Sequence, residues 1–177
     1  MFDKPYRLRG IHAQKARELV ATFDAVSKAQ FFKAAKDLYA FAPLVGFLYK
    51  RRANLDHTKS QETGEELDYN IMAEQVLSVQ EDLTFHFCLI MLLDKEYEPD
   101  EDARIDKAFR YIGKNQEDEA RFDEYIRGGV EVLHEKLIED EGEPEDYVKR
   151  LYDFLEEIQE WYNDKVEIDS LMNLCIN

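Results

Sequence analysis

Residues 83–93 read LTFHFCLIMLL and form the most hydrophobic stretch of this 177-residue chain. We expect this run to form the central helix of the core. A buried β-strand is the alternative for CLIMLL, because short apolar runs fit both structures. The helix is favoured, since 7 Gly and 4 Pro are too few for the many turns of an all-β fold.

Helical spacing of apolar residues continues upstream of this run. It predicts one helix over residues 11–23 and another over residues 28–52, with Ser27 as a candidate N-cap of the second. Pro43 interrupts the second helix, because proline lacks the backbone donor and disfavours helix at the residue before it. We therefore expect a kink or a break at Ala42.

The polar residues 54–69 show no apolar rhythm and predict a loop. A helix is expected over residues 71–79, before the central run, and another over residues 103–112, after it. Gly113 is expected to stop that helix, and Asn115 is a candidate cap for the one that follows.

The next helix is expected over residues 117–138, with one apolar stripe along its length. Gly128 and Gly129 interrupt the stripe, and each glycine inside a helix costs about 1 kcal/mol relative to alanine. Such a pair indicates either that another backbone packs closely there or that the helix breaks.

The last helix is expected over residues 147–165, after an acidic linker at 139–146, and its apolar residues recur at spacings of three and four. The fold class is therefore all-α. Residues 1–140 are expected to form a single compact multi-helix domain, which makes about six to seven helices in all. Residues 147–177 are expected to form a C-terminal amphipathic helix and tail, packed on this domain or on a partner.

Charge is divided unevenly along the chain. Residues 1–60 hold 12 Lys or Arg against 5 Asp or Glu, a net charge of +7, and residues 61–177 hold 11 against 34, a net charge of −23. The total of −16 is also what a merely soluble acidic surface would give. DNA binding by the isolated chain is disfavoured, because affinity for DNA depends on phosphate neutralisation by cations.

The residues that usually carry catalysis or bind metals do not occur in the required patterns. The four histidines stand outside zinc-ligand spacing. The acidic stretch from Asp94 does not match a calcium loop, because Pro99 and Ile105 stand where Gly and Glu are required. Phosphate-binding loops and nucleophile motifs are also absent from the sequence. We therefore expect no catalytic residues, no metal and no cofactor.

The location predicted for the chain is the cytoplasm. Its first ten residues, MFDKPYRLRG, lack the apolar segment of a secretory signal. The longest uninterrupted apolar run is much shorter than a membrane span. Cys88 and Cys175 are not paired by spacing, and Cys88 fits a small core residue.

Three groups of residues are candidates for binding or close packing. Lys50, Arg51 and Arg52 are candidates for an anionic partner or DNA, although cations at the end of a helix are also common. Arg7, Arg9 and Lys4 are candidates to join them in space. Trp161 and Tyr162 are candidates for a protein partner. Gly128 and Gly129 are candidates for close helix packing.

The middle of the chain resembles a family of small bacterial proteins, the DNA phosphorothioation-associated protein 4 type. The similarity covers residues 28–138, with Asp123 where the family usually has Glu and Arg127 where it usually has Asn. It rests on an apolar stretch, an arginine pair and a late glycine-containing run: Phe41, Ala42, Val45, Gly46, Phe47, Arg51, Arg52, Phe122, Asp123, Tyr125, Gly128, Gly129, Val132 and Leu133. The resemblance implies an accessory subunit that works beside nucleases, ATPases or modification enzymes in bacterial anti-phage defence, and it supplies no catalytic residues.

The sequence thus predicts a non-catalytic accessory subunit of a bacterial anti-phage defence or DNA-modification complex. It would act through protein contacts, would meet DNA only within the complex, and would bind neither a membrane nor a small-molecule substrate. The alternative is an acidic DNA mimic whose carboxylates imitate phosphates and block a DNA-binding protein.

Overall fold

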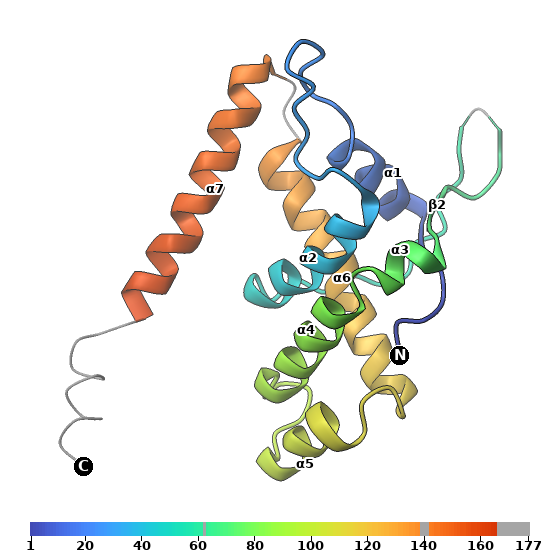
Figure 1. The fold of residues 1–177 in the computed structure, drawn as a ribbon, viewed down its shortest axis with the longest axis vertical. Coiled ribbons are helices and arrows are strands. Elements are labelled where there is room, and N and C mark those ends of the chain that lie inside the picture. The colour runs from blue at the N-terminus through green and yellow to red at the C-terminus, as the bar shows by residue number, and fades with distance from the viewer. Residues whose placement is uncertain (62, 139–141, 166–177) are drawn as a thin grey trace. The chain divides into compact units, whose positions relative to one another are not determined.

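The computed structural model describes residues 1–61, 63–138 and 142–165, with side chains as far as Trp161. Within these residues the chain is mostly helical, which confirms the predicted all-α class (Figure 1). The helices are α1 (Gly10–Leu19), α2 (Ala35–Leu48), α3 (Ala73–Leu77), α4 (Gln80–Leu93), α5 (Glu101–Ile105), the π-helical turn η1 (Asp106–Arg110), α6 (Gln116–Leu137) and α7 (Pro144–Lys165).

The chain divides into two compact units, Met1–Glu135 and Lys136–Asn177. In the first unit α6 is the central element. It is joined to α1 by a contact between His12 and Glu131, to α2 by closely packed glycines, and to α4 by the rings of Phe87 and Phe122, whose centroids are 5.4 Å apart.

The hydrophobic run at 83–93 is a helix, so the strand alternative is excluded. Leu83, Phe87, Ile90 and Met91 in α4 are each 0% exposed, and they form the core of the first unit together with residues of α6 such as Ile126. Their spacing of four, three and one places them on one side of the helix, as expected for burial of one apolar face.

A small sheet was not expected from the sequence. β1 (Tyr6–Arg9) pairs antiparallel with β2 (Asp68–Ile71), with Tyr6 opposite Ile71 and Arg9 opposite Asp68. Leu8 and Ile71 are the buried residues of the two strands. Two strands of four residues have too few alternating positions to stand out from a loop, so the predicted loop at 54–69 extended two residues too far.

The second helix differs from the expectation at its start. It begins at Ala35 instead of residue 28, and Ser27 is not its cap, because Ser27 lies in a turn closed by the Asp24 carboxylate. The Asp37 carboxylate accepts a hydrogen bond from the backbone of Ala34 at 3.1 Å and so closes the first turn.

The break that was one alternative at Ala42 does not occur, because Pro43 lies inside the continuous helix α2. A proline in a helix interior costs about 3 kcal/mol. Burial offsets that cost here, since Ala42 and Pro43 are both buried and Ala42 lies against Gly129 of α6.

The segment around residue 113 differs from the predicted helix over 103–112 but has the predicted cap at Asn115. The helix predicted over 103–112 begins earlier, at Glu101, and its second half is the π-helical turn η1. Gly113 has a positive φ of 65° and follows the end of η1. Asn115 caps α6 as expected, because its side-chain oxygen accepts from the backbone of Glu117 at 3.0 Å.

The second unit contains the end of α6 and α7. The last helix begins at Pro144, three residues before the predicted start, and Phe154 is its buried aromatic residue. Lys136 and Glu157 form an ion pair of 2.7 Å within this unit. The predicted tail at 166–177, with Cys175, lies outside the described residues. Among the described helices, none is both long and apolar enough to cross a membrane.

Candidate functional site

The crossing of α2 and α6 depends on three glycines. Carbonyl oxygens occupy the space that side chains at these positions would fill: Tyr125 faces Gly46, Ala42 faces Gly129, and Arg51 faces Gly128. Gly128 and Gly129 therefore lie inside a continuous helix, which answers the question that the sequence left open. The close approach holds the segment that follows α2 directly against α6.

The arginines of the basic triplet are paired with carboxylates of α6. Arg51 lies 3.5 Å from Glu131 and 3.3 Å from Glu135, and Arg52 lies 3.1 Å from Glu124. Both arginines remain partly exposed, and exposed pairs of this kind contribute about 0–1 kcal/mol each. The positive charge of this corner is consequently reduced by its own neighbours.

The other basic candidates are not joined to this corner by any ion pair within the described residues. Arg7 and Arg9 lie on β1, where they pair with Asp68 at 3.5 Å and with Glu66 at 3.9 Å. Lys50 is exposed and has a positive φ of 53°. The structure thus shows two separately paired basic groups, and a role for either in binding an anion stays a prediction.

The two aromatic candidates lie near the end of α7. The side chain of Trp161 is partly exposed, whereas that of Tyr162 lies outside the described residues. Other apolar side chains of α7 are more exposed than Trp161, with Val148 at 57% and Tyr152 at 65%. A role of Trp161 and Tyr162 in binding a protein stays a prediction.

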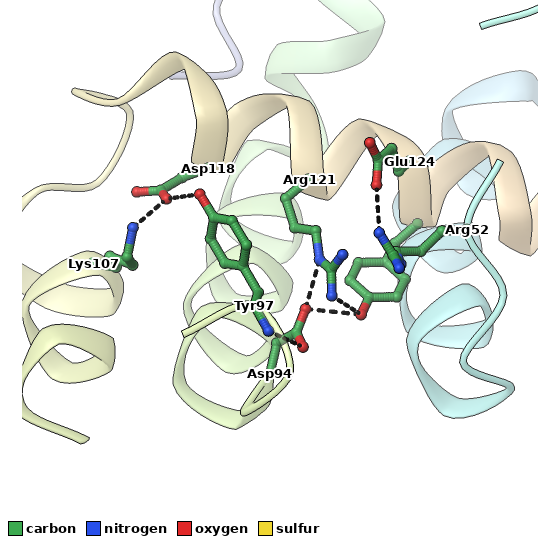
Figure 2. A network of polar contacts seen from close by, with 8 residues as sticks. Arg52, Asp94, Tyr97, Lys107, Asp118, Arg121 and Glu124 are labelled. Atoms are coloured by element: carbon green, nitrogen blue, oxygen red, sulfur yellow. Dashed lines mark hydrogen bonds and ion pairs between the residues drawn. The ribbon is translucent and has the colours of Figure 1, made fainter. Parts of the chain in front are cut away.

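A buried polar network joins α4 to α6 (Figure 2). One oxygen of Asp94 accepts from the Arg121 guanidinium and from the Tyr125 hydroxyl, both at 2.8 Å. The neighbouring Tyr97 hydroxyl donates to Asp118 at 2.6 Å, and Lys107 donates to the same oxygen at 2.8 Å. Each charged group in the network has an opposite partner, so the network orients these helices.

The pKa of Asp94 reflects this arrangement. Burial raises it, but the hydrogen bonds from Arg121, Tyr125 and the backbone of Tyr97 outweigh burial, so that the pKa lies below its ordinary value. The carboxylate is therefore charged in the folded protein at neutral pH, as a structural ion pair requires.

The outward face of α4 carries an exposed aromatic side chain. Phe85 is 64% exposed, although Phe87 is completely buried two positions later. Because consecutive residues of an α-helix are rotated by about 100°, these two side chains point in opposite directions. Phe85, Leu89 and Leu92 follow one another at spacings of four and three, so they form a second apolar stripe behind the buried one. Phe85 is its exposed member, and Leu89 and Leu92 are partly exposed. We call these three residues the α4 outer stripe.

Further exposed apolar side chains lie on an element that packs against α4. Phe109 of η1 is 60% exposed, and η1 contacts α4. Exposed carboxylates lie close in sequence to these apolar residues. The cations in the same segments include Lys95 and Arg110, and Arg110 pairs with Asp106. The exposed carboxylates are Glu81, Asp82, Glu96, Asp100, Glu101 and Asp102.

A cavity of about 360 Å³ lies between the N-terminal segment, α2 and α6. Four aromatic residues line it, among them Tyr6 and Tyr39, whose stacked rings have centroids 4.2 Å apart. Carboxylates also line it, among them Asp123 and Glu119 of α6. Burial, with Glu119, raises the pKa of Asp123 to about 6, although Arg127 and a hydrogen bond with Tyr6 act against that rise.

Two histidines pair with glutamates between α1 and α6. His12 is 2% exposed and lies 3.0 Å from Glu131, and His134 contacts Glu18. Burial lowers the pKa of His12. No group of three or more His, Cys, Asp or Glu side chains within the described residues has the geometry to hold a metal ion.

No family model, no curated protein and no solved structure matches this chain. Membership of the DNA phosphorothioation-associated protein 4 family accordingly stays a prediction that rests on the sequence motifs.

Sequence reasoning missed the residues that make up the polar network and the cavity. Asp94 and Arg121 are 27 positions apart and meet only in the folded chain. Tyr6 and Asp123 are 117 positions apart. The spacing of residues within either segment gives no signal of these contacts.

Proposed function

We propose that this chain is a non-catalytic binding subunit whose α4 outer stripe docks a basic, amphipathic segment of another protein. The observation that carries the proposal is the 64% exposure of Phe85 on the side of α4 opposite the buried Phe87. An exposed apolar stripe on a helix is the usual recognition surface for an amphipathic segment.

The charge of the chain supports a basic partner over a second copy of the chain. The carboxylates near the stripe, such as Glu81 and Asp82, are exposed, and the net charge is −16. A second copy would place like charges opposite each other, which is unfavourable, whereas Lys or Arg beside an apolar strip would complement them.

The resemblance supports a place in a bacterial DNA-modification or anti-phage complex. Proteins that handle DNA carry basic surfaces, so a nuclease, an ATPase or a modification enzyme of such a complex would fit the partner described above. In this proposal Lys50, Arg51 and Arg52 would contact DNA or an acidic surface only within the assembly.

The acidic DNA mimic remains the alternative. A mimic needs an array of carboxylates but no apolar stripe, so its binding should weaken steeply as salt concentration rises. The α4 outer stripe favours docking, since apolar contacts are much less sensitive to salt.

The first test uses the purified chain and a synthetic helical peptide of leucine and lysine as a model basic segment. We expect the peptide to bind, and a version with glutamate in place of lysine to bind much more weakly. Phe85→Gln should weaken binding of the lysine peptide by about tenfold, because a central apolar anchor typically contributes more than 1 kcal/mol. Met72→Gln is the matched control, since Met72 is 58% exposed outside the stripe.

Equal binding of the two peptides, or no effect of Phe85→Gln, would contradict the proposal. A second test captures partners from the native host with the tagged chain. Each captured protein is then purified and titrated with the wild-type chain, with Phe85→Gln and with Met72→Gln. A stoichiometric partner that loses affinity for Phe85→Gln alone supports docking. A DNA-binding protein that is displaced by duplex DNA and released by moderate salt supports the mimic.

A further inference from the structure

The cavity beside α6 has a chemistry that the proposed function does not use. Its volume of about 360 Å³ lies within the range of small-molecule sites, roughly 300–1,000 Å³. All residues that line the cavity belong to the first unit. None of them belongs to the α4 outer stripe, so the cavity and the stripe are separate sites.

One polar group of the cavity lacks a partner in the protein. Tyr39 is only 3% exposed and lines the cavity, yet its hydroxyl has no hydrogen-bond partner within the described residues. Its ring is held by stacking on Tyr6. The hydroxyl of a lining residue is free to hydrogen-bond to a molecule in the cavity, so the position of Tyr39 suits a ligand with a hydrogen-bonding group.

The charges of the residues that line the cavity determine which ligand charge is favoured. Asp3, Glu119 and Asp123 line the cavity with carboxyl groups, and Lys4 is the cationic side chain among them. Aromatic faces attract cations through the ring quadrupole. Carboxylates beside aromatic rings therefore favour an organic cation and disfavour an anion.

We propose that this cavity binds a small organic cation, with its ammonium group beside the Asp123 carboxylate and against the rings of Tyr6 and Tyr39. Asp123 supplies the opposite charge. The Tyr39 hydroxyl accepts a hydrogen bond from the ammonium group when the ligand is a primary amine.

The protonation of Asp123 gives the site a pH dependence. Its pKa is raised to about 6, mainly by burial and further by Glu119, while Arg127 and Tyr6 lower it. A bound cation stabilises the ionised carboxylate, so affinity should rise as the pH increases through about 6 and level off above it. The exposed Asp3, Glu119 and Lys4 also face the cavity, but the protonation of Asp123 is what changes in this range.

Calorimetric titration with putrescine, tetramethylammonium and butanediol tests the proposal. Putrescine is a primary diamine, tetramethylammonium carries no N–H donor, and butanediol is the uncharged analogue of putrescine. We expect saturable binding of one putrescine or tetramethylammonium per chain and no binding of butanediol. Asp123→Asn should weaken both cations by about tenfold or more, because a hydrogen bond to a charged group contributes about 1.5–3 kcal/mol.

Tyr39→Phe distinguishes direct contact from a general effect of charge. It removes only the hydroxyl, so it should weaken putrescine and leave tetramethylammonium unchanged. Glu74→Gln is the control for the negative charge of the whole chain, since Glu74 is exposed on α3 and does not line the cavity.

Three results would overturn the proposal. They are an absence of saturable binding by both cations, binding of butanediol as tight as that of putrescine, and equal losses in Glu74→Gln and Asp123→Asn. Should Asp123→Asn fail to fold by circular dichroism, the Tyr39→Phe comparison of the two cations decides the question alone.

Discussion

The backbone carbonyl oxygen of Ala42 lies against Gly129, in the space that a side chain at position 129 would occupy. This contact lets two helices meet backbone to backbone, at a point where α2 also contains a proline. Ala42 and Pro43 are both buried, and the helix continues through the proline.

Gly129→Ala should lower the free energy of unfolding by at least about 2 kcal/mol, because the new methyl group would force the two backbones apart. Alanine would by itself favour the helix by about 1 kcal/mol, so a loss of stability identifies the packing clash as the larger effect. Urea unfolding measures the change.

Gly64→Ala is the comparison for that experiment. Gly64 has a positive φ of 71° but no neighbouring atom within 4 Å of an added Cβ. Its substitution should cost only about 1 kcal/mol, from backbone strain. Equal losses at positions 64 and 129 would contradict the importance of the helix crossing.

Arg121→Met should destabilise the protein by about 3–5 kcal/mol, because it leaves the buried Asp94 carboxylate without its opposite charge. Arg121 and Asp94 are 8% and 4% exposed and are 2.8 Å apart. The double substitution with Asp94→Asn should cost less than the sum of the single ones. Thermal and urea unfolding of the wild type, the two single variants and the double variant give the double-mutant cycle that measures this coupling.

Asp123→Asn should change how stability depends on pH. The pKa of Asp123 is raised in the folded protein to about 6 from an ordinary value of 3.8. The folded state therefore binds more protons than the unfolded state between about pH 4 and pH 6, and stability falls as the pH rises through that range. The effect amounts to at most about 3 kcal/mol.

The asparagine variant lacks this titration, so its stability relative to the wild type should increase between about pH 4 and pH 7. Urea unfolding at several pH values provides the measurement. A constant difference between the two proteins across this range would show that Asp123 titrates at its ordinary pKa.

Phe87 and Phe85 lie on opposite sides of α4, and substitutions of the two should differ in their effect on stability. Phe87→Ala should cost about 3–5 kcal/mol, as expected for a fully buried phenylalanine. Phe85→Gln should change stability by less than about 1 kcal/mol, because the side chain is largely exposed. A large loss from Phe85→Gln in urea unfolding would mean that this side chain is covered within the chain.

Replacing Lys50, Arg51 and Arg52 together by glutamine should cost no more than about 2 kcal/mol, because their ion pairs are exposed. Retention of DNA by the reconstituted assembly is the functional measurement, and the proposal expects it to decrease. Unchanged retention, with the assembly intact, would limit these residues to their pairing with α6.

The sequence by itself determined the helical class. Apolar residues at spacings of three and four produce a helical face wherever they occur, so α4, α6 and α7 could be predicted within a few residues. The Asn115 cap could also be predicted, because the side-chain oxygen and the backbone group that it accepts from are two residues apart.

The tertiary structure decided everything that depends on distant partners. Ala42, the residue before Pro43, packs against α6 because Gly129, far along the chain, leaves room for its carbonyl group. The arginines of the predicted basic corner are paired because α6 brings Glu124 and Glu131 to them. Local patterns carry no information about such pairs, since their energies arise only when the chain brings them within a few ångströms. For the same reason the cavity of Tyr39 and Asp123 could not be read from either segment alone.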